Sequence, residues 1–345
     1  MKNILVTGGA GYIGSHVVVK LHEHGYNPII MDDFSNSRHS VLEGIKNITG
    51  KSFKVYEGDI LDQKLLKEVF SSQKIDGVIH FAAKKAVGES VDKPLYYYKN
   101  NVSGLVSILE VVQEYKVKNL IFSSSCTVYG QPDSLPVTEE TPKKPANSPY
   151  GNTKQIGEEI LEDTINSGID LKAIALRYFN PIGAHPSAEI GELPLGVPNN
   201  LVPFITQTAA GLRESLTVFG GDYNTQDGTC IRDYIHVMDL ADAHVRSIEY
   251  LETEYDLNFD VINVGTGSGN TVLEVIKAFE ETSKEKLNFK IGPRRPGDVE
   301  KIYAQVDKSK RLLKWQTQYS LEQAMSDSWK WQQKLANNSS TDSVS

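Results

Sequence analysis

The sequence predicts an α/β protein with a doubly wound parallel sheet and a smaller, mixed α/β substrate-binding lobe. A short apolar strand at residues 4–6 runs into a glycine-rich turn and then into an apolar helical pattern at 17–21. Apolar runs of strand length then alternate with helical stretches, a pattern typical of parallel sheets covered by helices. These runs lie at residues 28–31, 54–56, 78–83 and 120–125. A chain of 345 residues exceeds one ordinary domain but suits a single two-lobed unit.

Composition excludes several classes of partner. The chain carries 36 basic and 44 acidic side chains, a net charge of -8, and has no basic block, so we expect no nucleic-acid partner. We also expect no membrane segment and a cytoplasmic location, because no apolar run approaches the length of a bilayer span. The polar stretch 337–345 is expected to be disordered.

Cysteine and histidine usage indicates no metal site. Cys126 and Cys230 have no paired spacing, so neither a disulfide framework nor a zinc thiolate site is expected. His16, His22 and His24 lack acidic partners at ligand spacing and are interpreted as solvated side chains.

The first glycine turn has the features of a phosphate-binding loop. Gly8, Gly11 and Gly14 lie between a strand and a helix with the spacing G-x-x-G-x-x-G. Missing side chains let the backbone approach a pyrophosphate, and the following helix offers free N–H groups and a positive dipole end. A dinucleotide site is therefore predicted here.

Acidic residues at the ends of later strands refine this site. Asp32 and Asp33 end the strand at 28–31, and a carboxylate there accepts hydrogen bonds from a ribose and repels a 2′-phosphate, which favours NAD over NADP. Asp59 either flanks the adenine or caps its own loop. Since ligands of such sheets bind at the carboxyl ends of the strands, Asp32, Ala83, Lys85 and Ser125 are expected along one rim.

A tyrosine and a lysine begin a helix later in the chain. Ser148 is a candidate N-cap and Pro149 the first helical residue, which places Tyr150 and Lys154 one turn apart on one face. The reference pKa of tyrosine is about 10. We expect the neighbouring ammonium to lower the pKa of Tyr150 toward neutral pH, where the phenolate acts as a base.

Ser125 with Tyr150 and Lys154 forms the Ser, Tyr-x-x-x-Lys set of the short-chain dehydrogenase/reductase superfamily. From Met1 to about residue 335 the chain resembles the UDP-galactose 4-epimerases of its extended branch. The runs that carry the resemblance are 8–15, 81–90, 123–130, 177–186 and 228–239. The resemblance implies a Rossmann-type NAD domain at 1–178, to which 234–264 returns. It places the UDP-sugar lobe at 179–233 and 265–336.

The resemblance implies an NAD-dependent 4-epimerase that interconverts UDP-galactose and UDP-glucose through a transient 4-keto sugar. Tyr150 would remove the 4-hydroxyl proton, Lys154 would lower the phenol's pKa and bond the nicotinamide ribose, and Ser125 would orient the reacting oxygen. The implied cofactor-binding residues are Gly8, Gly11, Tyr12, Ile13, Gly14, Asp32, Asn36, Ser37, Asp59, Ile60, Phe81, Ala82, Ala83, Lys85, Asn100, Ser123, Tyr150, Lys154 and Tyr178.

The second lobe is expected to hold the UDP-hexose. Arg232 and Arg295 can each donate several N–H bonds to a pyrophosphate, and Asp298 can accept from ribose hydroxyls. Which of the adjacent Arg294 and Arg295 reaches the phosphate rests on the resemblance. The implied substrate-binding residues are Lys85, Ser125, Tyr150, Phe179, Asn180, Asn200, Leu201, Phe219, Arg232, Arg295, Asp298 and Ile302.

Other activities stay open at this level. A nucleotide-sugar dehydratase would need a carboxylate beside Ser125, and the sequence has none there; a non-catalytic NAD(P) sensor would tolerate loss of the tyrosine or lysine, and both are present. Ile302 takes the place where the family restricts or admits acetamido sugars, so an enzyme for UDP-GlcNAc and UDP-GalNAc, or one of dual specificity, is the main alternative.

A homodimer is also expected. Apolar residues in the stretch 93–117 have near-helical spacing, and the resemblance implies that this helix and the Tyr150 helix form a four-helix interface. A helix facing the core of a monomer explains the same spacing. The apolar residues concerned are Leu95, Val102, Leu105, Leu109 and Val112.

Overall fold

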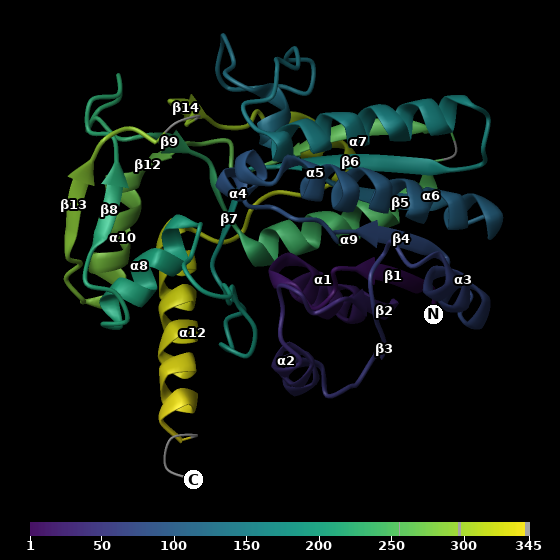
Figure 1. Cartoon of the computed structure of the whole chain (residues 1–345), viewed down its shortest axis with the longest axis horizontal. Coiled ribbons are helices and arrows are strands. Elements are labelled where there is room, and N and C mark those ends of the chain that lie inside the picture. Colours follow the sequence, from purple (N-terminus) through teal and green to yellow (C-terminus); the bar gives the residue numbers. More distant parts are fainter. Residues whose placement is uncertain (255, 296–297, 342–345) are drawn as a thin grey trace.

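The centre of the molecule is a seven-stranded parallel sheet, seen in a computed structural model that describes residues 1–254, 256–295 and 298–341 (Figure 1). Its strand order is β11-β6-β5-β4-β1-β2-β3, so the first strand lies inside the sheet and the chain winds outward in both directions. This order confirms the predicted doubly wound fold. The strands are β1 (Asn3–Thr7), β2 (Asn27–Asp32), β3 (Lys54–Glu57), β4 (Gly77–His80), β5 (Asn119–Ser125), β6 (Lys172–Tyr178) and β11 (Phe259–Val264).

Helices cover both faces of this sheet because its strands are apolar on both sides. One core cluster joins the sheet to α1 (Tyr12–Glu23), α2 (Ser40–Thr49) and α9 (Val237–Thr253). The other joins it to α3 (Gln63–Ser72), α6 (Gly104–Glu114) and α7 (Pro149–Asn166). Leu5 of β1, fully buried, pairs with Ile29 on one side and Val78 on the other, and so anchors the register.

The stretch 93–117 is helical but is not one regular helix. It consists of α5 (Pro94–Tyr97), a π-helical segment η1 (Tyr98–Ser103) and α6, preceded by α4 (Val87–Asp92). Leu105, Leu109 and Val112 are buried in the chain's own core, whereas Leu95 is 82% exposed. The core explanation therefore holds for α6, whereas α5, which a π-turn separates from α6, buries Tyr97 but exposes Leu95.

The smaller lobe lies beside the carboxyl ends of the strands, on the left of Figure 1. Its core joins α8 (Leu201–Ala209), α10 (Val272–Ser283), α12 (Leu321–Thr341) and β8 (Leu216–Phe219). The sequence Thr271-x-x-Glu274 is the pattern that predicts a capping box, and the structure has this capping box at the start of α10. The remaining elements are β7 (Asn180–Ile182), β9 (Ile231–Arg232), β10 (Tyr234–His236), β12 (Asn270–Thr271), β13 (Phe289–Gly292), β14 (Lys301–Ile302), α11 (Asp307–Leu313) and the 3-10 turn η2 (Cys126–Tyr129).

The C-terminal segment departs from the prediction. Helix α12 continues to Thr341, so the first five residues of the expected disordered tail are helical, because extending an existing helix costs far less than starting one. The rest of that prediction, residues 342–345, lies outside the described residues. Within the described part of the chain, no helix combines the length and apolarity that crossing a membrane requires.

Candidate active site

The glycine loop forms a narrow backbone cradle at the carboxyl end of β1. Gly8 has φ +71°, and a Cβ there would lie 2.9 Å from the backbone nitrogen of Ala82. A Cβ on Gly14 would lie 2.2 Å from the carbonyl oxygen of Gly8. Gly11 caps α1 without any side-chain hydrogen bond, so the first N–H groups of the helix stay available. These features fit the pyrophosphate of a dinucleotide.

Asp32 stabilises the glycine loop through hydrogen bonds to its carboxylate. Its buried carboxylate accepts from the N–H of Ala10 at 3.0 Å and from the Ser37 hydroxyl at 2.9 Å. Burial raises the pKa of Asp32, and these hydrogen bonds oppose the rise. Its position at the end of β2 is the one predicted for a ribose contact, with Asn36 exposed nearby.

The side chains of three other predicted cofactor residues make contacts within the protein itself. Asp59 is exposed and accepts from the N–H of Leu61 at 2.9 Å, so it caps its loop. The side chain of Ile60 is buried in the sheet core, which leaves only its backbone to face a ligand. The ring of Phe81 packs against His244, with centroids 4.7 Å apart.

Two residues that sequence reasoning missed hold the predicted ligand residues in place. The carboxylate of Glu192 accepts from Lys85 Nζ at 3.2 Å and from Asn200 Nδ2 at 2.6 Å, and so joins residues of the two lobes. The buried Asn101 accepts from Asn100 and exchanges two hydrogen bonds with the backbone of the residue before Lys85. Nothing in the spacing of Glu192 or Asn101 indicated these contacts.

The start of α7 is built as predicted. Ser148 accepts from the N–H of Gly151 at 3.1 Å and Pro149 is the first helical residue. This places Tyr150 at the end of β5, where its hydroxyl lies close enough to Ser125 for the serine to lower its pKa. Ser125 and Tyr150, 25 positions apart in the chain, therefore meet at the rim.

Lys154 reaches the same rim from inside the protein. It is 4% exposed, and its Nζ donates to the Ser123 carbonyl oxygen at 2.5 Å and to the Ser123 hydroxyl at 3.1 Å. The ammonium lies 5.9 Å from the ring centroid of Tyr150. Ser123 is also hydrogen-bonded to the hydroxyl of Tyr178, so four of the predicted residues share one cluster.

The expected effect of this lysine on the tyrosine is wrong for the ligand-free protein. Removal of water raises the pKa of Tyr150 to about 12, although the Ser125 hydrogen bond opposes the rise. Burial likewise lowers the pKa of Lys154 to about 7, opposed by the charge of Glu158. Desolvation disfavours both charged forms, and at these positions it outweighs the attraction between them.

The predicted phosphate residues of the second lobe also converge. The Asp298 carboxylate accepts from Arg295 Nη2 at 2.7 Å and lies 3.7 Å from Arg232 Nη2. The Arg295 guanidinium lies 5.9 Å from the ring centroid of Phe219, which is 43% exposed and free to contact a flat ligand. These four residues bring two cations and an apolar surface together.

The adjacent arginine belongs to a different contact. Arg294 donates from Nε to the Asp222 carboxylate at 2.7 Å, and its guanidinium lies 4.1 Å from the ring centroid of Tyr223. It therefore points away from the group around Asp298. Two residues of the predicted turn, Pro296 and Gly297, lie outside the described residues.

The residues predicted to face the sugar lie in an apolar cluster. Phe179 and Ile302 share a buried cluster with Cys126, next to Ser125, and Ile302 is 4% exposed. Ile302 pairs with Arg232 in the register of β14 and β9, so the predicted specificity residue and a predicted phosphate ligand share one small sheet. Asn180 and Leu201 begin β7 and α8.

The histidines differ from their predicted state. His16 is fully buried and bonds the Tyr12 carbonyl oxygen at 2.7 Å, and His24 has the acidic partners Glu249 and Asp242. The sequence did not show these partners because Glu249 lies 225 positions from His24. Among the described residues no group of histidine, cysteine and acidic side chains could hold a metal ion.

A parallel sheet with a glycine loop at its first strand and a Ser125, Tyr150 and Lys154 set at its rim defines a short-chain dehydrogenase/reductase. Residues 5–328 match the family model described as GDP-mannose 4,6 dehydratase. The chain is 50% identical over 333 residues to UDP-glucose 4-epimerase 2 of Arabidopsis thaliana, covering 96% of this chain and 95% of that protein. It is 48% identical over 334 residues to UDP-glucose 4-epimerase of Bacillus subtilis, covering 97% and 98%.

Solved structures agree with these relatives. UDP-glucose 4-epimerase from Bifidobacterium longum, in complex with NAD+ and UDP, superposes with a TM-score of 0.94 at 45% identity, covering 97% of this chain and 99% of that one. The chain therefore belongs to the UDP-glucose 4-epimerase family.

Proposed function

We propose that this chain is an NAD-dependent epimerase that interconverts UDP-galactose and UDP-glucose through a transient 4-keto sugar. The observation that carries the proposal is the convergence of Ser125, Tyr150 and Lys154 at the rim beside the glycine loop. Relatives named UDP-glucose 4-epimerase, two of whose structures hold NAD with UDP or a UDP-sugar, support both the reaction and the cofactor.

The residues divide the chemistry at carbon 4 between them. Tyr150 accepts the proton of the 4-hydroxyl and later returns it, while Ser125 orients the reacting oxygen through its own hydroxyl. Lys154 supplies the positive charge that favours the phenolate. NAD, when bound, supplies the hydride acceptor and donor, and the glycine loop and Asp32 would hold it in place.

The second lobe anchors the nucleotide so that the sugar can present either face. Arg232 and Arg295 donate to the pyrophosphate, Asp298 accepts from the ribose, and Phe219 covers the uracil. Lys85 and Asn200 exchange their contacts with Glu192 for contacts with the ligand. Ile302 closes the sugar end, which favours the plain hexoses over the acetamido sugars.

A dehydratase is a poorer fit to this site. Elimination needs an acid beside the hydroxyl of Ser125, and its sequence neighbours are Ser124, Cys126 and Thr127. The carboxylate bonded to Ser124 is that of Glu158, which is buried and bound to Arg177. It is therefore not free to donate a proton to a leaving group.

Turnover without added cofactor tests the proposal. The purified protein is incubated with UDP-galactose, and UDP-glucose is measured by chromatography. We expect conversion without added NAD, because the cofactor is regenerated in each cycle. Starting from either UDP-galactose or UDP-glucose, the final ratio of the two should be the same, because the enzyme brings them to equilibrium. A folded, NAD-loaded sample that converts neither sugar contradicts the proposal and favours the sensor.

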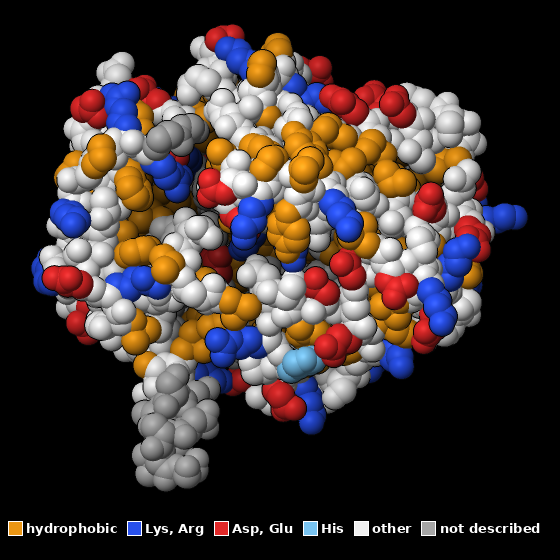
Figure 2. Space-filling view, viewed as in Figure 1, with side chains coloured by type: hydrophobic (Ala, Val, Ile, Leu, Met, Phe, Trp, Pro, Cys, Tyr) orange, Lys and Arg blue, Asp and Glu red, His pale blue; other side chains and the backbone are white. Residues whose placement is uncertain are grey.

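We also propose that the protein is a cytoplasmic homodimer. Apolar side chains gather over α4, α5 and α6 in Figure 2, and the exposed ones are Val87, Val91, Leu95, Tyr96 and Val106. A patch of this kind on one face is typical of a protein interface. Sedimentation at micromolar concentration should give a dimer, and Leu95→Glu should give a monomer, whereas Leu212→Glu, on an exposed site of the other lobe, should not.

A further inference from the structure

Three consecutive serines of β5 each hold one residue of α7. Ser125 lies next to the Tyr150 hydroxyl and lowers its pKa, Ser123 accepts from Lys154, and Ser124 donates to the Glu158 carboxylate at 2.6 Å. In α7 these three partners follow at intervals of four residues, so they lie along one helix face. Two of the three, Tyr150 and Lys154, are the proposed reacting pair, and the third, Glu158, takes no direct part in the proposed transfer of proton and hydride.

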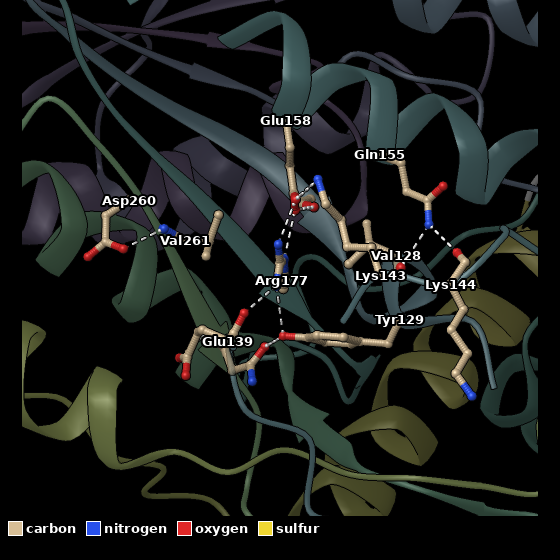
Figure 3. Close-up of polar contacts among 12 residues, drawn as sticks. Val128, Tyr129, Glu139, Lys143, Lys144, Gln155, Glu158, Arg177, Asp260 and Val261 are labelled. Carbon is tan, nitrogen blue, oxygen red and sulfur yellow. Dashed lines mark hydrogen bonds and ion pairs between the residues drawn. The ribbon is translucent and has the colours of Figure 1, made fainter. Parts of the chain in front are cut away.

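The carboxylate of Glu158 is buried and accepts hydrogen bonds from several side chains. It is 2% exposed and accepts from Arg177 twice, from Nε at 2.8 Å and from Nη2 at 2.7 Å. Lys143 adds a longer contact of 3.4 Å (Figure 3). These cations and the Ser124 hydroxyl lower the pKa of Glu158 in spite of its burial, so the carboxylate is ionised at neutral pH.

Arg177 extends this arrangement to the second lobe. It donates to the Tyr129 hydroxyl at 3.1 Å, and that hydroxyl donates to Asn263 at 2.6 Å (Figure 3). Asn263 donates to the carbonyl oxygen of Val137 at 3.1 Å, and Val137 exchanges backbone hydrogen bonds with residues 303 and 305, just after the predicted sugar-side residue. The Glu158 carboxylate therefore has little freedom to move.

The groups around Lys154 leave Glu158 as its source of negative charge. Burial lowers the pKa of His80 on β4 to about 3, so this histidine is neutral. Tyr178 on β6 is a phenol whose pKa burial raises. Within the described residues, Glu158 is the one anion that acts on Lys154, and the nearby cations Arg177 and Lys143 are bound to Glu158 itself.

We propose that Glu158 is a positioning residue for the reaction, whose fixed carboxylate keeps the Lys154 side chain an ammonium ion beside Tyr150. An uncharged Lys154 would donate a weaker hydrogen bond and would no longer favour the phenolate. Arg177 and Ser124 act one step further out by fixing the carboxylate. This role rests on the proposed epimerase activity, but the charge state of Lys154 can be measured without any turnover.

The test is the titration of Lys154 in the purified protein with its bound nucleotide. Lysine labelled with carbon-13 at Cε reports protonation by NMR, and the Lys154→Met spectrum assigns the signal. In Glu158→Gln we expect the Lys154 midpoint to fall by about one pH unit or more, the effect of removing an opposite charge near a buried group. The alkaline limb of the kcat profile for UDP-galactose should move down with it, and kcat should approach about one tenth of the wild-type value at pH values above both midpoints.

Matched variants separate charge from packing. Glu159→Gln alters the exposed neighbour of Glu158 and should leave the Lys154 midpoint unchanged. Glu158→Asp retains a carboxylate, so its Lys154 midpoint should lie close to the wild-type value. If Glu158→Gln does not fold because Arg177 is left unpaired, Glu158→Gln with Arg177→Gln removes both charges, and the midpoint should still fall. An unchanged midpoint in a folded variant overturns the proposal, even if kcat falls. Absence of turnover in the wild type contradicts the epimerase activity instead, because the NMR midpoint does not depend on it.

Discussion

Replacing Tyr150 by phenylalanine removes one oxygen atom from the site and leaves the rest of the ring in place. The hydroxyl interacts with Ser125, so the loss to stability is at most that of one hydrogen bond, about 1 kcal/mol net. For a protein of this size that lowers Tm by about 2 °C. General-base catalysis contributes about 10²- to 10⁴-fold, so kcat should fall by that factor, equivalent to about 2.7 to 5.5 kcal/mol of barrier.

The assay is the conversion of UDP-galactose to UDP-glucose, with Tm and bound nucleotide measured on the same samples. KM should change by less than about threefold, because the nucleotide contacts of the second lobe are untouched. Tyr26→Phe is the control, since Tyr26 is a buried tyrosine whose hydroxyl bonds Glu252 far from the rim. If Tyr150→Phe retained kcat within tenfold of the wild type while folded and NAD-loaded, Tyr150 would not be the base.

Three further variants test the cofactor loop, the phosphate group and acid stability. Gly14→Ala places a methyl 2.2 Å from a backbone oxygen, so the purified protein should lose its nucleotide. The control Gly88→Ala, whose new methyl has no atom within 4 Å, should keep the nucleotide. Chromatography of the nucleotide released on denaturation measures both. Arg295→Ala removes charge-assisted donors near Asp298, and calorimetry should show that UDP binds about 10- to 100-fold more weakly. If Arg295 does not reach the ligand, the affinity should change by no more than about threefold. Burial lowers the pKa of His16 to about 3, so below pH 6.5 the unfolded chain binds a proton that the folded protein refuses. His16 alone should therefore lower the free energy of unfolding by about 1.4 kcal/mol per pH unit as pH drops from 6.5, and urea unfolding at pH 7 and 5 should show a fall that is smaller in His16→Gln than in the wild type.

Local signals were enough to predict the sheet and most of its helices. The glycine turn, the Ser148 cap and the Thr271 capping box each depend on residues within one turn of each other, and all three are present in the structure. The errors arose where distant residues decide the outcome. His16 is buried against residues of the second lobe, and α5 exposes Leu95 next to a π-turn that no spacing rule indicates.

The same distinction applies to the site. Ser125, Tyr150 and Lys154 were located by a strand end and a helix start and assigned their roles by the resemblance to a known family, and the structure brings them to one rim. Glu192 and Asn101 were missed because an acidic or amide residue in a loop has no periodicity to mark it. Glu192 lies 107 positions from its partner Lys85, and Asn101 lies 17 positions from its partner Lys84.

The failed pKa expectation for Tyr150 shows what two residues on a helix face cannot settle. A spacing of four places an ammonium near a phenol, but it does not fix the proton count of either group. In the folded chain, burial favours the neutral lysine and the neutral tyrosine, and the nearest opposing charge belongs to Glu158, one further turn along α7. The protonation of the reacting residues is therefore set by the electrostatics of their surroundings, and the Arg177–Glu158 ion pair, buried behind the site, is the part of those surroundings that substitution can change without touching the substrate.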